Sequence, residues 1–370
     1  MGVWHLKGGR RWYDGKLQDN DVFSIVVEND PMIRDIRLQP EDIITSGLYD
    51  LHCHVQGVRP TWAGANNILG LGAEAYLFDG IFGLADAGSY GYDHWKDSDQ
   101  LWKMSRVQIR SWLNVLPEGL TQTEPNHTLA VDIDLDRLVQ TYQDANGRLL
   151  GYKYMHGLSG GDPDVELAWL RKVKQASRAV GAPVMVHLTE GPLSIEAIID
   201  ELDAGDIFAH IYNGAGPGGL ILDDTGHVKS AVREAREKGI LFELDAGFKH
   251  INFDVFRQAL AEGIKPYFIA TDTTCNNWRI LPVYSMAHFL SEVILLGLDV
   301  ETTLQCAIDR PRAYMGIEDH PDKNLVVLKK RVHATVFQDN IVDKNEFIGE
   351  WEYIPKYCVL SNQAVRKNEF

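Results

Sequence analysis

The stretch GLYDLHCHV, residues 47–55, decides how the rest of the chain is interpreted. It begins with glycine, is largely apolar, and carries His52 and His54 two positions apart. Side chains alternate between the two faces of a strand, so both imidazoles would share one face while Cys53 points the other way. The pair is either part of a metal site or two hydrogen-bonded histidines of a core, and the motif alone leaves both open.

Beyond this stretch, strand-like runs alternate with helix-like runs, and turn residues separate them. This rhythm predicts parallel βα units. Eight strands are the number that a closed (β/α)8 barrel, or TIM barrel, requires. The expected strands are residues 47–55, 81–89, 110–116, 149–157, 183–188, 206–213, 240–246 and 266–273.

The helix between the fourth and fifth strands has the clearest signals. Asp162 can cap it, Pro163 fits its first turn, and Gly181 can end it. Residues 281–316 are expected to be helical throughout.

The two ends of the chain follow a different pattern. Residues 1–46 and 324–370 contain short alternating runs without helical spacing. We therefore expect an α/β protein with two parts. A barrel would comprise residues 47–323, and a small β-sandwich domain would be built from residues 1–46 plus 324–370.

The amino-acid composition limits which binding partners and which cellular location can be expected. The 370 residues are 45% hydrophobic and 24% charged, and no segment approaches the roughly 18 uninterrupted apolar residues of a membrane span. There are 52 acidic and 36 basic side chains, which makes nucleic acid and membrane surfaces poor partners. Four scattered cysteines and no secretory signal favour the cytoplasm. A small-molecule substrate is expected, and a homo-oligomer is compatible with the sequence.

In a barrel of this kind the active site lies at the C-terminal ends of the strands. Reactive side chains gather at these ends on the first, fourth, fifth, sixth and eighth strands, so they could converge on one point. They are His52, His54, Lys153, His187, His210 and Asp272.

Each position also has an ordinary interpretation. Lys153 could form a buried salt bridge with Asp50 or Asp272, or its amine could have reacted with carbon dioxide to give a carbamate that bridges two cations. His187 and His210 could be hydrogen-bonded core residues. Asp272 could cap a helix or shape a turn. The residues alone do not decide between these interpretations.

The six positions together resemble the amidohydrolase superfamily. Its pattern is HxH on strand one, a carboxylated lysine on strand four, single histidines on strands five and six, and an aspartate on strand eight. Nearly the whole chain takes part in the resemblance. Its dihydroorotase-related deacetylase branch is suggested by LADAGSYGYDHW (84–95), WLNVLPEG (112–119), GDIFAHIYNG (205–214) and IDRPRAYMG (308–316).

The resemblance implies two divalent cations, with zinc favoured and manganese, iron or cobalt as alternatives. One cation would be held by His52, His54, Lys153 and Asp272, and the other by Lys153, His187 and His210. Lys153 would carry the carbamate. A hydroxide bridging the cations would attack the substrate carbonyl, with Asp272 as general base and acid.

The implied reaction is hydrolysis of a non-peptide amide or ester of a small, acidic metabolite, as in a deacetylase. Cyclic amide hydrolysis, as in dihydroorotases and hydantoinases, is the alternative. Deamination is less favoured because such enzymes commonly lack the bridging lysine. A non-catalytic scaffold is disfavoured because all six positions are filled.

Two departures concern the substrate. Met155 stands where this branch usually has arginine, and DAGFKHINF (245–253) replaces a glycine-histidine-glycine loop. Residues 117–128 are interpreted as an active-site loop. The substrate contacts expected instead are Asn213, Lys249, His250, Asn276, Asn277 and Arg279.

Overall fold

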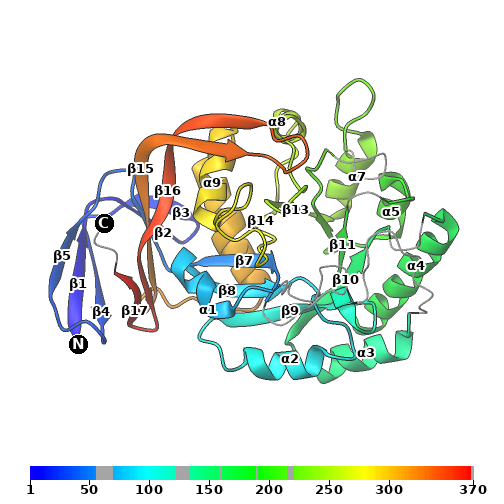
Figure 1. Ribbon diagram of the computed structural model, residues 1–370, viewed down its shortest axis with the longest axis horizontal. Coiled ribbons are helices and arrows are strands. Elements are labelled where there is room, and N and C mark those ends of the chain that lie inside the picture. The colour runs from blue at the N-terminus through cyan, green and yellow to red at the C-terminus, as the bar shows by residue number, and fades with distance from the viewer. Residues whose placement is uncertain (56–69, 122–132, 158–160, 189–190, 215–220, 368–370) are drawn as a thin grey trace.

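The computed structural model describes residues 1–55, 70–121, 133–157, 161–188, 191–214 and 221–367. Its centre is a sheet of eight parallel strands whose spatial order follows the chain (Figure 1). The expected eight strands and the TIM-barrel fold are confirmed. The strands are β7 (Leu48–Cys53), β8 (Ile81–Asp86), β9 (Gln108–Asn114), β10 (Leu149–Met155), β11 (Val184–His187), β12 (Ile207–Ala209), β13 (Leu241–Asp245) and β14 (Phe268–Ala270).

The barrel closes between its first and last strands. Cys53 forms a parallel bridge with Thr273 just beyond β14, and the His54 backbone N–H donates to the Thr273 carbonyl at 2.9 Å. The Asp272 N–H donates to the His52 carbonyl at 2.7 Å. Three of the six predicted residues therefore form the seam of the barrel with their backbones.

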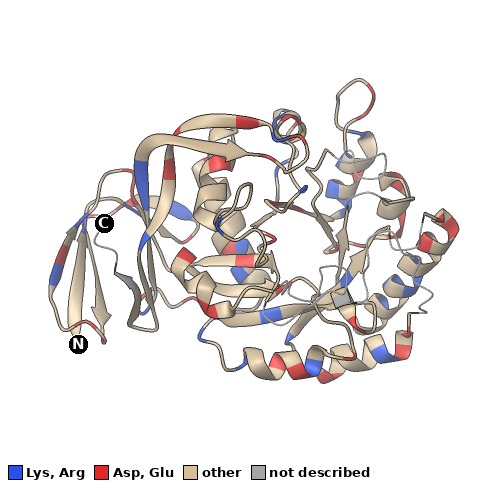
Figure 2. Ribbon diagram, viewed as in Figure 1, with Lys and Arg blue, Asp and Glu red and all other residues tan. Residues whose placement is uncertain are grey.

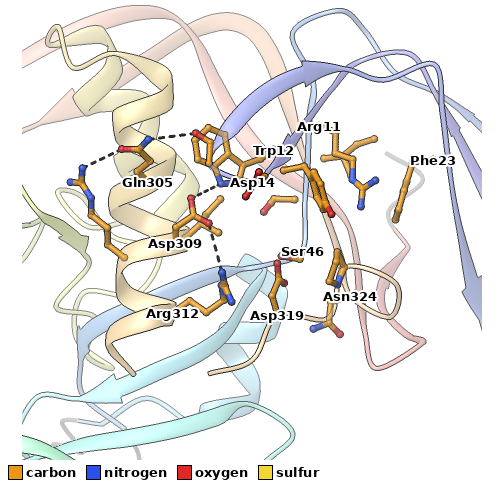
Figure 3. Close-up of a pocket in the computed structure, with 17 residues that line it drawn as sticks. Arg11, Trp12, Asp14, Phe23, Ser46, Gln305, Asp309, Arg312, Asp319 and Asn324 are labelled. Carbon is orange, nitrogen blue, oxygen red and sulfur yellow. Dashed lines mark hydrogen bonds and ion pairs between the residues drawn. The ribbon is translucent and has the colours of Figure 1, made fainter. Parts of the chain in front are cut away.

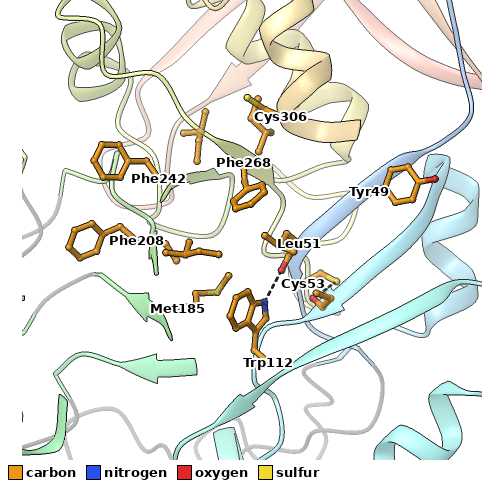
Figure 4. Close-up of a cluster of buried hydrophobic side chains, with 14 of the residues drawn as sticks. Tyr49, Leu51, Cys53, Trp112, Met185, Phe208, Phe242, Phe268 and Cys306 are labelled. Atoms are coloured by element: carbon orange, nitrogen blue, oxygen red, sulfur yellow. Dashed lines mark hydrogen bonds between the residues drawn. The ribbon is translucent and has the colours of Figure 1, made fainter. Parts of the chain in front are cut away.

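An apolar layer fills the barrel beneath these strand ends (Figure 4). Trp112 stacks on Tyr314 with ring centroids 6.0 Å apart, and Phe268 meets Tyr314 edge-on at 5.2 Å. Met185 lies beside Lys153 on the neighbouring strand, with its Sδ 3.3 Å from the lysine Nζ. Apolar side chains therefore pack next to the predicted site residues inside the barrel.

Helices cover the outside of the barrel. The predicted helix after the fourth strand is α4, whose Asp162 side chain accepts from the N–H groups of Asp164 and Val165 and whose end is Gly181 in the left-handed region, at φ 67°. The outer helices, α4 included, are α2 (Trp95–Trp102), α3 (Leu135–Asp144), α4 (Pro163–Val180), α5 (Ile195–Glu201), α7 (Ser230–Lys238) and α8 (Phe253–Ala261).

The segment 281–316 is not one continuous helix, contrary to the sequence-based expectation. Residues 281–283 form a turn and Tyr284 forms a bridge with Trp278, so the first helix begins only after Ser285. Gly297, at φ 117°, interrupts the segment again because a residue with this backbone conformation cannot continue a helix. The helical parts are α9 (Met286–Leu295), α10 (Val300–Leu304), a π-helical turn at Gln305–Asp309 and α11 (Arg310–Tyr314).

Both termini contribute strands to two packed sheets beside the barrel (Figure 1). One sheet has β1 (Gly2–Lys7) between β4 (Val22–Val27) and β5 (Arg34–Arg37). Between the sheets lies an apolar core that includes Trp4, Val327 and Val359, which makes a β-sandwich. The second sheet contains β2 (Arg10–Tyr13), β3 (Lys16–Asp19), β6 (Ile43–Thr45), β15 (Leu325–Gln338), β16 (Glu346–Leu360) and β17 (Gln363–Lys367).

Charged side chains of both signs are interspersed along the outer helices α2 and α4 (Figure 2). Within the described part of the chain, no helix combines the length and the apolar character needed to cross a membrane.

A cavity of about 600 Å³ lies between the terminal strands and the helical segment that ends in α11 (Figure 3). Its wall includes Ser46, at the N-terminal side of β7, and the Trp12 indole N–H, which donates to Asp309 at 2.9 Å. None of the predicted site residues lines it. The predicted site is at the other end of the same strand.

Candidate metal centre

The strand ends bring the six predicted side chains into one cluster inside the barrel. Lys153 Nζ lies 3.0 Å from His52 Nε2, and the rings of His52 and His210 are 4.9 Å apart at their centroids. Five of the six residues are buried, and His187 is partly exposed. The convergence that their spacing predicts is therefore present.

The contacts of His54 reveal a place for a cation. The Ser89 hydroxyl donates its single hydrogen to Asp86 at 2.6 Å, so it can only accept from His54 Nδ1, at 2.8 Å. In the neutral imidazole this contact fixes the tautomer and places the lone pair on His54 Nε2. That nitrogen faces Asp272 Oδ1 at 3.2 Å, and Oδ1 is buried and accepts no hydrogen bond from the described residues. Two electron-rich atoms held this close match the ligands of a cation.

A second pair of nitrogens is arranged in a similar way. Both oxygens of Asp245 lie 2.7 Å from His210 Nδ1, and this carboxylate accepts from the Nδ1–H. The lone pair of His210 is then on Nε2, which faces His187 Nδ1 at 2.7 Å. A proton or a cation must lie between these two nitrogens.

Lys153 does not form either salt bridge that the sequence allowed. Within the described residues, Asp50 instead accepts hydrogen bonds from the Thr271 hydroxyl at 2.5 Å and the Thr271 N–H at 3.2 Å, and no ion pair joins Lys153 to Asp272. Burial lowers the pKa of Lys153 to about 8, although the negative charge of Glu243 acts against this shift. A substantial fraction of this lysine is therefore neutral near physiological pH.

Three imidazoles of the cluster, those of His52, His187 and His210, are held in the neutral form. Burial lowers the pKa values of His52, His187 and His210 well below the ordinary value, and neighbouring positive charges add to the effect. Neutral imidazole is the form that binds metal ions. For Asp272, burial alone would raise the pKa, but the hydrogen bond from His250 and the other interactions with neighbouring histidines together outweigh burial and hold the pKa well below its usual range.

Among the predicted substrate residues, His250 lies inside the cluster. Its Nδ1 is 3.0 Å from Asp245 and 2.9 Å from Asp272 Oδ2, and its ring lies against His210 with centroids 3.6 Å apart. Burial lowers its pKa, but the two carboxylates more than compensate and raise the pKa to about 9. His250 is therefore a cation between two carboxylates.

The three predicted asparagines lie elsewhere in the surrounding loops. Asn213 is buried, and its amide donates to the Leu188 carbonyl at 2.8 Å. Asn277 is also buried and donates to the Asp272 carbonyl at 2.9 Å. Asn276 is exposed. The two buried amides hold backbone next to the site and are not directed at a ligand by these contacts.

The remaining predicted positions are away from the cluster or cannot be placed. Arg279 pairs with Asp79 in the loop after β14, Lys249 is exposed, and Met155 packs beside Leu120. Of the predicted loop 117–128, residues 122–128 lie outside the described part of the chain.

Two residues of β13, Glu243 and Asp245, were not anticipated. Both are fully buried and face the cluster, with Glu243 Oε1 only 2.5 Å from His52 Nδ1. Burial raises the pKa of Glu243, and the charge of Asp245 adds to the rise. The available signal was the alternation ELD within a buried strand, since two acidic side chains on an inward face require partners.

Possible metal ligands occur in overlapping groups whose donor atoms all lie within 4.8 Å of one another. Neutral imidazoles combined with carboxylates are ligands for divalent transition metals. This end of the barrel therefore carries side chains that could hold a divalent cation. The groups are His52, His54 and Asp272; His187, His210 and His250; His210, Asp245, His250 and Asp272; and His52, Glu243 and Asp245.

Known proteins resemble the chain over most of its length, although no protein-family model matches it. A deacetylase of Agrobacterium fabrum is 26% identical over 341 residues, covering 88% of this chain and 80% of the relative. A deacetylase of Brucella anthropi is 25% identical, with coverage of 88% and 81%.

Solved structures share the fold. A dihydroorotase superposes with a TM-score of 0.81 at 20% identity, covering 98% of both chains. An adenine deaminase gives 0.80 at 19% identity, covering 98% of this chain and 99% of the other. The chain is therefore similar over most of its length to curated deacetylases, and it shares the fold of the dihydroorotase and of the adenine deaminase.

Proposed function

We propose that this protein is a hydrolase of the deacetylase type, which uses divalent cations to remove an acyl group from a small molecule. The observation that carries the proposal is the close approach of His54 Nε2 to Asp272 Oδ1, because it forms half of a metal site at the place where a barrel enzyme has its active site. The names of the curated relatives support the reaction class.

Two groups of side chains would hold the cations. His52, His54 and Asp272 would hold one, and His187 and His210 the other, with a carbamate on Lys153 between them. Zinc suits these ligands. When bound, the cations would supply an activated water and polarise the substrate carbonyl.

Several features of Lys153 support a carbamate. Carbon dioxide adds to a neutral amine, forming an N–C bond and releasing one proton, and burial favours the neutral amine here. Gly88 also leaves room beside the side chain, since a Cβ at this position would lie 2.6 Å from Lys153 Cβ. The added carboxylate would give the lysine the two oxygens that bridging requires.

Asp272 is proposed as the general base and acid. Its Oδ2 receives the hydrogen bond from His250, and its Oδ1 is left for chemistry. Its backbone is held at φ 49° by the hydrogen bond to the His52 carbonyl, which fixes where the carboxylate points. Asp272 would accept a proton from the attacking water and return it to the leaving group.

The names of the relatives support an acylated substrate. We favour an N-acyl or acyloxy metabolite of small size, and we expect a cytoplasmic location because the four scattered cysteines lack the paired spacing of a disulfide framework.

The test is a substrate panel with purified protein supplied with zinc and bicarbonate. It would contain N-acetyl amino acids, acyloxy acids, dihydroorotate, hydantoins and adenine, and acid and ammonia release would be measured. We expect acetate release from at least one N-acetyl or acyloxy compound. Ammonia from adenine, with every amide and ester inert, would replace the proposal with deamination.

Variants connect the activity to the site. Lys153→Ala and Asp272→Asn should each lower kcat/KM by about a thousandfold or more, because each removes a ligand, a proton carrier or both. Lys96→Ala, an exposed lysine on α2, is the matched control. Full activity in either site variant would contradict the mechanism.

A further inference from the structure

The turn of the long β15–β16 hairpin, residues 339–345, reaches the loop that carries His250. The Ile341 N–H donates to the Phe248 carbonyl at 3.0 Å, and the Asn340 side chain donates to the Ile251 carbonyl at 3.4 Å. These two contacts lie on either side of His250 in the sequence. In Figure 1 the orange and red hairpin arches from the terminal sheets, over α9, towards α8.

The turn is held in shape by its own side chains. Buried Asp339 accepts from the N–H groups of Asn340 at 2.7 Å and Asn345 at 3.0 Å. Buried Asn340 accepts in turn from the N–H groups of Val342 at 2.9 Å and Asp343 at 2.7 Å. Asn340 therefore makes two kinds of contact. Its side-chain oxygen orders the turn, and its amide N–H donates to the neighbouring loop.

A row of rings anchors the hairpin on the barrel. His288 of α9 stacks on Phe337 at 4.5 Å, and Phe337 stacks on Phe347 at 5.1 Å. Phe347 meets Phe253, the first residue of α8, edge-on at 5.3 Å. Because Phe253 follows directly on the His250 loop, the hairpin supports this loop both at its middle and at its end.

The course of this loop decides where the His250 imidazole lies. A Cβ on Gly247 would be 1.8 Å from His250 Nδ1, so the ring occupies the space that a side chain at position 247 would fill. In that space the ring contacts both Asp245 and Asp272. A shift of the backbone by a fraction of an ångström would lengthen those hydrogen bonds.

We propose that Asn340 is a positioning residue for the active site. It has no contact with the six predicted metal-site residues and acts by holding the 248–251 backbone so that His250 stays against Asp272. The inference rests on the proposed function, because it gives the terminal hairpin a part in the geometry of the residue that carries protons. The C-terminal strands would then contribute to catalysis without entering the barrel.

The first test is independent of any substrate. Hydrogen–deuterium exchange of the peptide spanning 246–252 should be about tenfold faster in Asn340→Ala than in the parent, with both cations retained by elemental analysis. Asn340→Asp keeps the oxygen that orders the turn and loses the amide donor, so it should show part of this increase. Val342→Ala, an exposed change in the same turn, should show none.

The second test uses the best acyl substrate of the panel. Asn340→Ala should lower kcat about tenfold and change KM less than twofold. In a His250→Gln background the same change should have no further effect, because the residue through which it acts is gone.

Unchanged exchange in both Asn340 variants, or an equal loss of kcat in the His250→Gln background, would overturn the proposal. If Asn340→Ala does not fold, the Asn340→Asp comparison decides. If no acyl compound is hydrolysed, the exchange result still decides the positioning claim, and the proposed reaction alone is lost.

Discussion

The end of β7 carries His52 and His54, whereas β13 carries Glu243 and Asp245, and the two pairs do different things. His52 of β7 and His54, one residue beyond this strand, present nitrogen atoms to the centre of the site. Glu243 and Asp245 of β13 approach the far nitrogens of imidazoles, at 2.5 Å from His52 and 2.7 Å from His210. One strand supplies ligands, and the other orients and polarises them.

A metal site of this kind thus has two layers. The ligands can be recognised in the sequence, whereas the carboxylates that contact the ligands cannot. Carboxylates that accept from metal-binding imidazoles fix the ring and raise its basicity. Glu243 and Asp245 are as buried as the ligands. Acidic residues in a strand are ordinarily exposed to solvent, so the sequence does not mark these two as part of the site. Three experiments test whether one strand supplies the ligands and the other orients them.

The largest effect is expected on β7. His54→Ala removes a ligand from the pair of atoms that faces Asp272, so the protein should lose at least one cation and about a thousandfold or more in kcat/KM. Elemental analysis and steady-state kinetics measure this. Cys53→Ala, which changes the residue between the histidines, should keep both cations because Cys53 faces away and its thiol contacts the Ala85 carbonyl. Metal retention in His54→Ala would show that β7 is not a ligand strand.

A smaller effect is expected on β13. Glu243→Gln and Asp245→Asn keep the shape of the side chain but weaken its acceptance from the imidazole, and each should lower zinc affinity by about 10- to 100-fold. Competition with a chromophoric chelator measures the affinity. Glu237→Gln, an exposed acid on α7, is the control. Affinities within twofold of the parent would mean that β13 is only structural.

The smallest effect is expected for Lys153 of β10, whose Nζ lies 3.0 Å from His52 Nε2. With a pKa of about 8, its neutral fraction rises about fivefold from pH 7 to pH 8 and less than twofold from pH 8 to pH 9. At constant dissolved carbon dioxide, the initial rate of ¹³C-carbamate formation in metal-free protein should follow this curve by NMR.

The same measurement reports on β13. The charge of Glu243 raises the pKa of Lys153, so Glu243→Gln should move the curve to lower pH and speed the reaction at pH 7. A tenfold rise per pH unit that continues to pH 9 would indicate an ordinary, solvated lysine and exclude this account.

Much of the fold follows from local patterns. Each of the eight barrel strands was visible because both faces of a buried parallel strand are apolar, and helix α4 was visible from Asp162 and Gly181. The six reactive positions could be anticipated because strand ends in a barrel must meet. Their meeting at one end of the barrel can be predicted even though they are far apart in the sequence.

The rest depends on contacts that no local pattern encodes. Asn213 was expected at the substrate, but its amide is directed at the Leu188 carbonyl by the course of two separate loops. The contact between Ile341 and Phe248 joins residues 93 positions apart through a hairpin whose direction is set by stacked rings. In the sequence, an acidic residue that faces into the barrel, such as Glu243, cannot be distinguished from one that faces solvent.

The seam of the barrel has a consequence for how the protein is assembled. The hydrogen bonds that join β14 to β7 are made by the backbones of His52, His54 and Asp272, whose side chains are the proposed ligands of one cation. A cation there would tie together the first and last strands of the barrel, which are the farthest apart along the chain. Metal supply would then govern the lifetime of the folded barrel as well as its activity, and chelation should make the seam the first part of the barrel to open.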